Sequence, residues 1–246
     1  YVYCLPFNDF DAVEQCLNDH HGEIAALLVE PCLGNIVGIE PKDGFLQHLR
    51  NLCDKYNVVL IFDEVKTGFR LSNGGARETY EVIPDISTYA KSLGNGVPVA
   101  AFGGKSEVMN VIGGGSVAHA GTFGGNGVSM SAANAVLDIL NEAPVLKELS
   151  IRGQKLKKGM DNILDEVGLP HQMCGHPNIQ GFLITEHKVE EVRDLAYSDD
   201  AMYEKIMDHM FDRGVWVEND PREPWFLCAA HTLSLIHISE PTRPSS

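Results

Sequence analysis

An aspartate and a lysine, each at the end of a mostly apolar run, are the residues of this chain best placed to do chemistry together. Asp63 follows the run Val58 to Phe62, and Lys91 follows the run Ile86 to Ala90. A lysine at the end of a strand can form an imine with an aldehyde, and a nearby carboxylate can hold a proton on a heterocyclic nitrogen. Pyridoxal phosphate (PLP) chemistry requires that pair, a Schiff-base lysine and an acidic partner for the pyridinium nitrogen.

The pattern of apolar residues predicts parallel strands that would position this pair. Ile24 to Val29 is a continuous apolar run, typical of a strand covered on both faces, and Val58 to Phe62 is the next buried strand. The strand–helix–strand order predicts a right-handed crossover in a parallel sheet, whose ligands bind beyond the carboxyl ends of its strands. We expect the intervening helix to open at 41–44 and to bury a stripe of Phe45, Leu46, Leu49, Leu52 and Cys53.

Two short strands, two glycine loops and a long helical region are predicted next. The helical region runs from about Ser129 to Val167 and is interrupted at Pro144, because proline breaks or starts a helix. The strands are expected at Ile86 to Ala90 and Val99 to Phe102, and the loops at Gly113 to Gly115 and Gly121 to Gly127.

The sequence predicts a domain boundary near Glu142-Ala143-Pro144, followed by a smaller α+β unit. The end of the chain, 233–246, has no helical period and no cap, and it resembles translated non-coding adaptor sequence, so we exclude it from the argument. In the smaller unit we expect strands at Gln180 to Ile184, Gly214 to Val217 and Phe226 to Ala230, and a helix at Ala201 to Arg213.

The length, net charge and cysteine content of the chain limit the classes of protein to which it can belong. The 246 residues are enough for one large domain or two modest ones, and the net charge of −15 argues against nonspecific binding to nucleic acid or to an anionic membrane. The six cysteines form no C-x-x-C pair, and the chain shows no signal peptide and no long apolar run. We therefore expect a cytoplasmic protein, although the chain starts at Tyr1 and a targeting segment could precede it.

Three other kinds of chemistry were considered. Glu30, Asp63 and Glu64 could supply a carboxylate pair for glycoside hydrolysis, but nothing else in the sequence indicates a sugar site. Phosphoryl transfer would need a G-x-x-x-x-G-K-[ST] run, which the sequence lacks. Metal binding is the third possibility, with four histidines as candidate ligands. Their spacing fits no metal-ligand pattern, so we expect no metal site. The four are His119, His171, His176 and His231.

The chain resembles the class III aminotransferases, PLP-dependent enzymes of fold type I, and among them most closely the glutamate-1-semialdehyde aminomutase branch. The matching segments are Val29-Glu30-Pro31, Gly34-Asn35, Phe62-Asp63-Glu64-Val65, Gly68-Phe69-Arg70, Pro84-Asp85-Ile86, Ala90-Lys91, Gly94-Asn95-Gly96 with Pro98, Gly121-Thr122-Phe123, Gly125-Asn126, Gly214-Val215, Glu223 and Ala230-His231-Thr232.

This resemblance covers residues 1–232 and implies an α/β fold in two parts. Residues 1–142 would be the second half of the PLP-binding large domain, with a mainly parallel sheet, and residues 143–232 an incomplete small α+β domain. Residues 233–246 would be a non-native tail. The family's phosphate-binding turn and ring-stacking aromatic would lie upstream of Tyr1. Two hypotheses stay open: a PLP-dependent transferase or mutase, or a catalytically incompetent fragment with at most a binding or structural role.

The resemblance also implies a role for each of five residues. Lys91 would be the Schiff-base lysine and would afterwards carry the proton at the substrate carbon. Asp63 would pair with the pyridinium nitrogen, and Val65 would pack against the ring. Thr122 would contact the cofactor phosphate across a homodimer interface, and Glu223 would lie near the substrate.

The implied reaction moves an amino group from a small-molecule donor to a carbonyl acceptor, or within one molecule as an aminomutase does. The segment Asp220 to Trp225 departs from the aminomutase pattern, which carries a serine and an aromatic there. The sequence therefore does not identify the substrate; Arg222 and Trp225 in this segment indicate only that it is polar, with or without a carboxylate.

Overall fold

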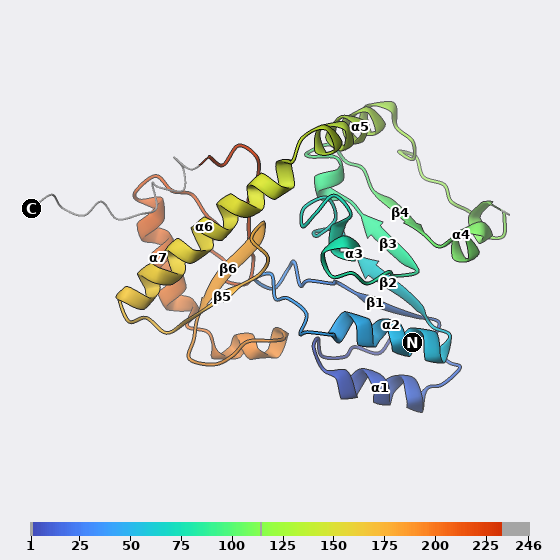
Figure 1. Cartoon of the computed structure of the whole chain (residues 1–246), viewed down its shortest axis with the longest axis horizontal. Coiled ribbons are helices and arrows are strands. Elements are labelled where there is room, and N and C mark those ends of the chain that lie inside the picture. Colours follow the sequence, from blue (N-terminus) through green and yellow to red (C-terminus); the bar gives the residue numbers. More distant parts are fainter. Residues whose placement is uncertain (1, 114, 233–246) are drawn as a thin grey trace, which may run out of the picture. The chain divides into compact units, whose positions relative to one another are not determined.

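The computed structural model describes residues 2–113 and 115–232, which form two compact units (Figure 1). The first unit contains the residues up to Pro31 together with Pro41–Pro144, and the second contains Cys32–Glu40 and the residues from Val145 onward. The predicted tail at 233–246, and Gly114 of the first glycine loop, lie outside the described residues.

The first unit contains a four-stranded sheet in the order β1-β2-β3-β4 (Figure 1). Strands β1 (Ala26–Val29), β2 (Val59–Asp63) and β3 (Ile86–Tyr89) are parallel, which confirms the predicted mainly parallel sheet. The last strand, β4 (Ala101–Gly104), is antiparallel to β3 and starts later than the predicted Val99 to Phe102. The carboxyl ends of the three parallel strands therefore share one edge of the sheet.

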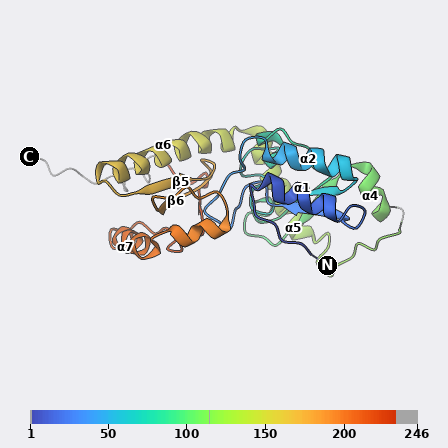
Figure 2. The same cartoon turned by 90° about the horizontal axis from the view of Figure 1, so that it is seen from below.

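Helices α1 (Phe10–Asp19) and α2 (Phe45–Tyr56) contact each other, and α2 also contacts β2 (Figure 1 and Figure 2). The predicted apolar stripe of α2 is buried throughout, which explains why this segment forms a helix over the sheet. Asn57, with a positive φ of 55°, ends the helix in the left-handed conformation that is frequent just past a helix C-terminus.

The remaining helices of the first unit connect or follow the strands. The expected interruption at Pro144 is confirmed, because α5 (Gly127–Glu142) ends before it and α6 (Val145–Glu166) begins after it. The remaining helices of the first unit are α3 (Gly75–Thr79), the 3₁₀ turn η1 (Lys91–Leu93), α4 (Ser106–Gly113) and α5 (Gly127–Glu142).

The prediction that the Ile24 to Val29 strand is covered on both faces is wrong for the described residues. Ala26 is exposed and Leu28 is 65% exposed, while Leu27 and Val29 on the other face are half-buried. An apolar run shows that a strand is suited to burial, but it does not show which segment supplies the cover. Among the described residues, only one face of β1 is partly covered.

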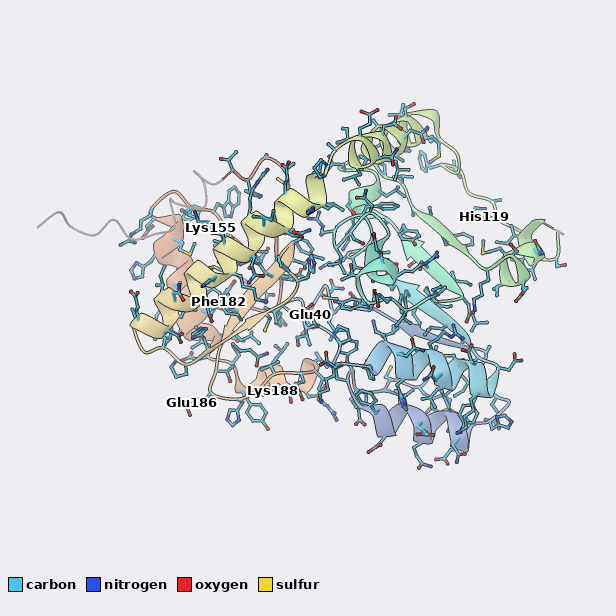
Figure 3. The ribbon with its side chains drawn as sticks, viewed as in Figure 1. Glu40, His119, Lys155, Phe182, Glu186 and Lys188 are labelled. Atoms are coloured by element: carbon cyan, nitrogen blue, oxygen red, sulfur yellow. The ribbon has the colours of Figure 1, made fainter. Side chains whose placement is uncertain are left out.

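The second unit contains the three-stranded antiparallel sheet β5-β6-β7 and a core beside it. Phe182, labelled in Figure 3, lies in this core with Tyr203 and Trp225. The elements are α6 (Val145–Glu166), β5 (His171–Cys174), β6 (Ile179–Ile184), the 3₁₀ helix η2 (Val192–Tyr197), α7 (Asp200–Phe211) and β7 (Trp225–Phe226).

Two of the predicted strands in this unit are corrected. Gly214 to Val217 forms no strand: Val217 packs against the core of this unit and Trp216 is 87% exposed, but no described strand pairs with the segment. The strand expected at Phe226 to Ala230 is reduced to β7, which pairs with β6 through only Phe226 and Trp225.

The segment Cys32–Glu40 belongs to the second unit, whereas the sequence analysis assigned it to the first domain. Its ends are joined by a bridge between Leu33 and Ile39. The Val37 amide donates to the Arg222 carbonyl at 2.5 Å, which ties the segment to the loop before β7. This long-range contact could not be read from the local sequence. The proposed boundary of the natural domains near Glu142 stays a prediction.

Candidate active site

Asp63 is the last residue of β2 and lies at the carboxyl edge of the parallel sheet, as predicted. Its Oδ1 accepts hydrogen bonds from the Val65 amide at 3.0 Å and from the Thr88 hydroxyl at 3.2 Å. Both of these bonds end on Oδ1, so within the described part of the chain Oδ2 is left to accept another donor. A carboxylate oriented in this way can hold a proton on a ligand nitrogen.

Lys91 follows β3 and opens the turn η1, so it lies beyond the carboxyl end of the strand next to β2. The side chain is exposed, and the backbone has a positive φ of 40°, which is uncommon for a residue other than glycine. Because Thr88 of the same strand pairs with Asp63, the structure brings the lysine and the aspartate to one edge of the sheet.

Val65 lies in the turn directly after β2 and is half-buried. Its amide holds Asp63, so the position of its backbone is fixed relative to the carboxylate. The predicted packing of its side chain against a cofactor ring stays a prediction, and its location next to Asp63 supports it.

Glu64, the neighbour of Asp63, has a different role. It is fully buried and accepts hydrogen bonds from the Ala76 amide at 2.6 Å and the Ser87 hydroxyl at 3.4 Å. Burial raises the pKa of Glu64 above its ordinary value, although these hydrogen bonds oppose the shift. A carboxylate enclosed in this way anchors the turn after β2 and gives no support to the glycosidase interpretation.

Thr122 lies in an exposed turn between α4 and α5, where the Gly124 amide donates to the Gly121 carbonyl at 2.9 Å. The neighbouring Phe123 is 82% exposed. Thr122 makes no described hydrogen bond with Asp63 or Lys91, so the described part of the chain does not by itself unite it with them. A contact with a phosphate held by another subunit stays a prediction.

Glu223 belongs to the second unit. It lies in a turn in which its own amide donates to the Asp220 carbonyl at 3.1 Å. Arg222 is engaged by the Asp220 carboxylate, with Nε at 2.9 Å and Nη2 at 2.6 Å. Trp225 is buried, and its Nε1 donates to the Tyr203 hydroxyl at 3.0 Å. Trp225 is therefore part of the core, which corrects its interpretation as an indication of the substrate.

No group of three or more His, Cys, Asp or Glu side chains is placed to hold a metal ion in residues 2–113 and 115–232. None of the described helices is both long enough and apolar enough to cross a membrane.

The residues at the edge of the sheet fit PLP. Asp63 offers an oriented acceptor for a ring N–H, and Lys91 offers a primary amine beyond the adjacent strand. Sequence analysis identified both residues but missed Thr88, whose hydroxyl holds the Asp63 carboxylate, and Ser92, whose hydroxyl joins the turn of Lys91 to the turn after β2. Ser92 donates to the Gly68 carbonyl at 2.6 Å. The only signal for them was their polar side chains close to the lysine.

Comparison with known proteins gives the family. The aminotransferase class-III family profile matches residues 6–238. Glutamate-1-semialdehyde 2,1-aminomutase of Aquifex aeolicus is 38% identical over 233 residues, which cover 94% of this chain and 55% of that protein. The chain thus spans about half the length of the curated relatives it matches.

Solved structures agree on the fold. An omega-transaminase from Sphaerobacter thermophilus matches with a TM-score of 0.86 at 29% identity, covering 95% of this chain and 54% of that one. A β-phenylalanine aminotransferase from Variovorax paradoxus also gives 0.86, at 28% identity and the same coverage. The predicted fold type I α/β architecture is confirmed. The chain belongs to the class III aminotransferase family, whose members depend on PLP.

Proposed function

We propose that the protein is a PLP-dependent aminotransferase that moves an amino group between small molecules, with Lys91 as the residue that binds the cofactor. The observation that carries this proposal is the placement of Asp63 and Lys91 at one edge of the sheet, linked by Thr88. Membership of the class III family supports it independently.

Each residue of the site has a physical task in this proposal. The bound cofactor supplies an electron sink for the substrate carbon. Lys91 Nζ would hold the cofactor through its aldehyde, and the same amine would move a proton at the substrate carbon. Asp63 Oδ2 accepts the ring N–H and keeps that nitrogen protonated. The Val65 amide and the Thr88 hydroxyl hold the carboxylate in place before the cofactor binds, so it need not reorganise.

The attachment site can be tested directly on the complete protein. Borohydride should bleach its visible absorbance band, and peptide mass mapping should find the reduced pyridoxyl group on Lys91. Lys91→Arg is the matched control, because arginine keeps the positive charge but cannot form the linkage. A pyridoxyl group on a different lysine of the wild-type protein would overturn the assignment.

Intramolecular amino transfer is a second candidate, favoured by one observation. Curated relatives at 35–38% identity are glutamate-1-semialdehyde 2,1-aminomutases. The departure of Asp220 to Trp225 from the aminomutase pattern leaves the substrate of either reaction open. A product balance separates the two, because a transaminase must consume a separate amino donor and release its keto acid. An aminomutase isomerises its substrate without a second product.

We propose a homodimer in which Thr122 contacts the cofactor phosphate of the other subunit. The exposed turn that carries Thr122 supports this proposal, because an exposed hydroxyl can donate to a phosphate outside the unit. Mixed dimers of Lys91→Ala and Thr122→Ala subunits should regain some activity, since one of their two sites then has both residues intact. Verified mixed dimers without any recovery would contradict the arrangement.

The cytoplasm is the proposed compartment. All six cysteines are free thiols in the structure, as expected in a reducing environment. Cell fractionation of the complete protein with an antibody would test this, and recovery of the protein in a secreted fraction would contradict it.

A further inference from the structure

The turn that carries Lys91 is held in an unfavourable backbone conformation. Lys91 has a φ of 40°, in the left-handed region that side chains other than glycine rarely adopt. The turn is a single 3₁₀ turn, in which the Leu93 amide donates to the Ala90 carbonyl at 2.9 Å and the Gly94 amide to the Lys91 carbonyl at 3.1 Å. Such short turns have poor hydrogen-bond geometry, so support from outside the turn is needed to keep this conformation.

Ser92 supplies such support. It is half-buried, and its hydroxyl donates to the Gly68 carbonyl at 2.6 Å. Gly68 belongs to the turn that follows Asp63, and its own amide donates to the Glu64 carbonyl at 2.8 Å. The Ser92 hydroxyl thus joins the turn that carries the lysine to the turn that begins at the aspartate.

The acceptor of this hydrogen bond is itself tightly placed. A Cβ on Gly68 would lie 2.5 Å from Tyr89 Cδ1 and 2.8 Å from the Glu64 carbonyl oxygen, so only glycine fits there. Tyr89 is the last residue of β3, directly before the lysine turn. The Gly68 carbonyl therefore has little room to move, and a donor bonded to it is held at a fixed place.

We infer that Ser92 is a positioning residue for Lys91: its hydrogen bond to Gly68 holds the 3₁₀ turn, whose first residue Lys91 has a left-handed φ, at the edge where Asp63 lies. The catalytic part of this inference rests on the proposed function, whereas the structural part does not. Ser92 itself touches neither the substrate nor the cofactor in this scheme.

The structural part is tested first, on the complete protein without cofactor. Hydrogen–deuterium exchange of the amides in 90–95 should be about three- to tenfold faster in Ser92→Ala, the range expected for one lost hydrogen bond. Ser92→Thr keeps the hydroxyl and should exchange like the wild type. Ser72→Ala is the matched control, because it also loses a hydroxyl-to-carbonyl bond, to Gly75 at 2.8 Å, in the same unit. It should leave 90–95 unchanged.

The catalytic part is tested on the loaded enzyme. Ser92→Ala should keep the pyridoxyl group on Lys91 after borohydride, lower kcat about three- to tenfold at an unchanged KM, and shift the pH midpoint of the visible band. Ser92→Thr should restore all three values.

The outcomes separate the two proposals. Unchanged exchange in Ser92→Ala, or exchange equally fast in Ser92→Thr, overturns the role of Ser92 whatever the protein catalyses. Faster exchange with unchanged kcat and pH midpoint overturns its catalytic part. A pyridoxyl group on another lysine in the wild type overturns the proposed function, while the exchange result still decides whether Ser92 holds the turn.

Discussion

Thr88 donates a hydrogen bond from its hydroxyl to Asp63 Oδ1 at 3.2 Å, and the two residues are partners in the parallel register of β2 and β3. The strand that leads into Lys91 therefore also orients the carboxylate of its neighbour. The positions of the lysine and of the aspartate carboxylate are therefore coupled. A shift of β3 by a single residue would displace both the Thr88 hydroxyl and the turn that carries Lys91.

Removal of the Thr88 hydroxyl should weaken the orientation of Asp63 without removing its charge. Thr88→Val keeps the β-branched shape that suits a strand, so the sheet should persist. We expect kcat to fall about three- to tenfold, the effect of one lost hydrogen bond, and Thr88→Ser to stay close to the wild type. Steady-state kinetics of the three proteins checks this. A Thr88→Ser variant as slow as Thr88→Val would point to lost packing of the methyl group instead.

Removal of the Asp63 carboxylate should have a larger effect. In Asp63→Ala the ring nitrogen loses its acidic partner and the electron sink weakens, so turnover should fall on the order of a hundredfold or more. The cofactor should remain attached to Lys91, because that linkage does not need the carboxylate. The measurement is the rate at which the substrate α-proton exchanges with solvent, and a rate equal to that of the wild type would count decisively against the assigned role.

Asp85 should be the main electrostatic anchor of the first unit. It accepts from Arg50 Nη1 at 2.8 Å, from the Leu60 amide at 2.7 Å and from Lys105 Nζ at 2.7 Å. Asp85→Asn would remove one of the two counter-charges of Arg50, whose Nη2 keeps Asp54 Oδ1 at 2.6 Å, so the free energy of unfolding should fall by about 1–3 kcal/mol. Lys105→Met is the control and should cost less than about 1 kcal/mol, because that side chain is well exposed. Denaturant unfolding of both variants gives their free energies of unfolding. Equal losses in Asp85→Asn and Lys105→Met would contradict the role of Asp85 as the main electrostatic anchor.

The same cluster predicts sensitivity to acid. Burial alone would raise the pKa of Asp85, but hydrogen bonds from Lys105, the Leu60 amide and Arg50 outweigh it and lower the pKa below its ordinary value. A depressed folded-state pKa contributes stability above the ordinary value of about 3.9, and this contribution is lost as the pH falls through the folded value. The difference in unfolding free energy between wild type and Asp85→Asn should therefore shrink in strong acid.

Gly75 should tolerate alanine poorly, because its neighbour is the buried Glu64 carboxylate. Its φ is +66°, and a Cβ there would collide with Glu64 Oε2, which the Ala76 amide holds at 2.6 Å. Gly22→Ala is the control, because Gly22 has a φ of +82° and nothing within 4 Å of its Cβ position. We expect about 1 kcal/mol of destabilisation from backbone strain at Gly22 and a further 1–3 kcal/mol, roughly, at Gly75. Equal melting temperatures for the two variants would refute the collision.

The sequence predicted the positions of the candidate pair, Asp63 and Lys91, because each residue follows a strand with a clear pattern. The run Val58 to Phe62 and the run Ile86 to Ala90 both became strands close to the expected bounds. Parallel strands place their carboxyl ends at one edge, so the meeting of Asp63 and Lys91 follows from topology alone. The contacts of Glu64 with Ala76 and of Ser92 with Gly68 do not follow from topology, because they depend on the course of the intervening turns.

Two further differences between the predicted and the observed secondary structure, at α1 and at 214–217, have local causes. The helix α1 was not predicted, although Asp9 caps it by accepting from the Ala12 amide and the helix buries Val13 and Leu17. That signal was present and was overlooked. The strand expected at Gly214 to Val217 failed for the opposite reason, because β-favouring residues form a strand only where a partner strand is available.

His171 should make the stability of the second unit depend on pH. Its Nε2 lies 3.0 Å from Asp161 Oδ1, and its Nδ1 lies 2.9 Å from the Leu169 carbonyl. Burial alone would lower the pKa of His171, but these hydrogen bonds and the charges of Asp161 and Asp165 raise it above its ordinary value. A raised folded-state pKa contributes stability that is complete below the ordinary value of about 6.5 and is lost as the pH rises through the folded value.

Asp161→Asn should therefore lower the free energy of unfolding at about pH 5.5 by about 1 kcal/mol or less, because Asp161 is half exposed. At about pH 9 the same substitution should change the free energy of unfolding by almost nothing. Unfolding free energies measured at both pH values test this, and an equal loss at the two values would show that Asp161 acts through packing rather than through the charge on His171.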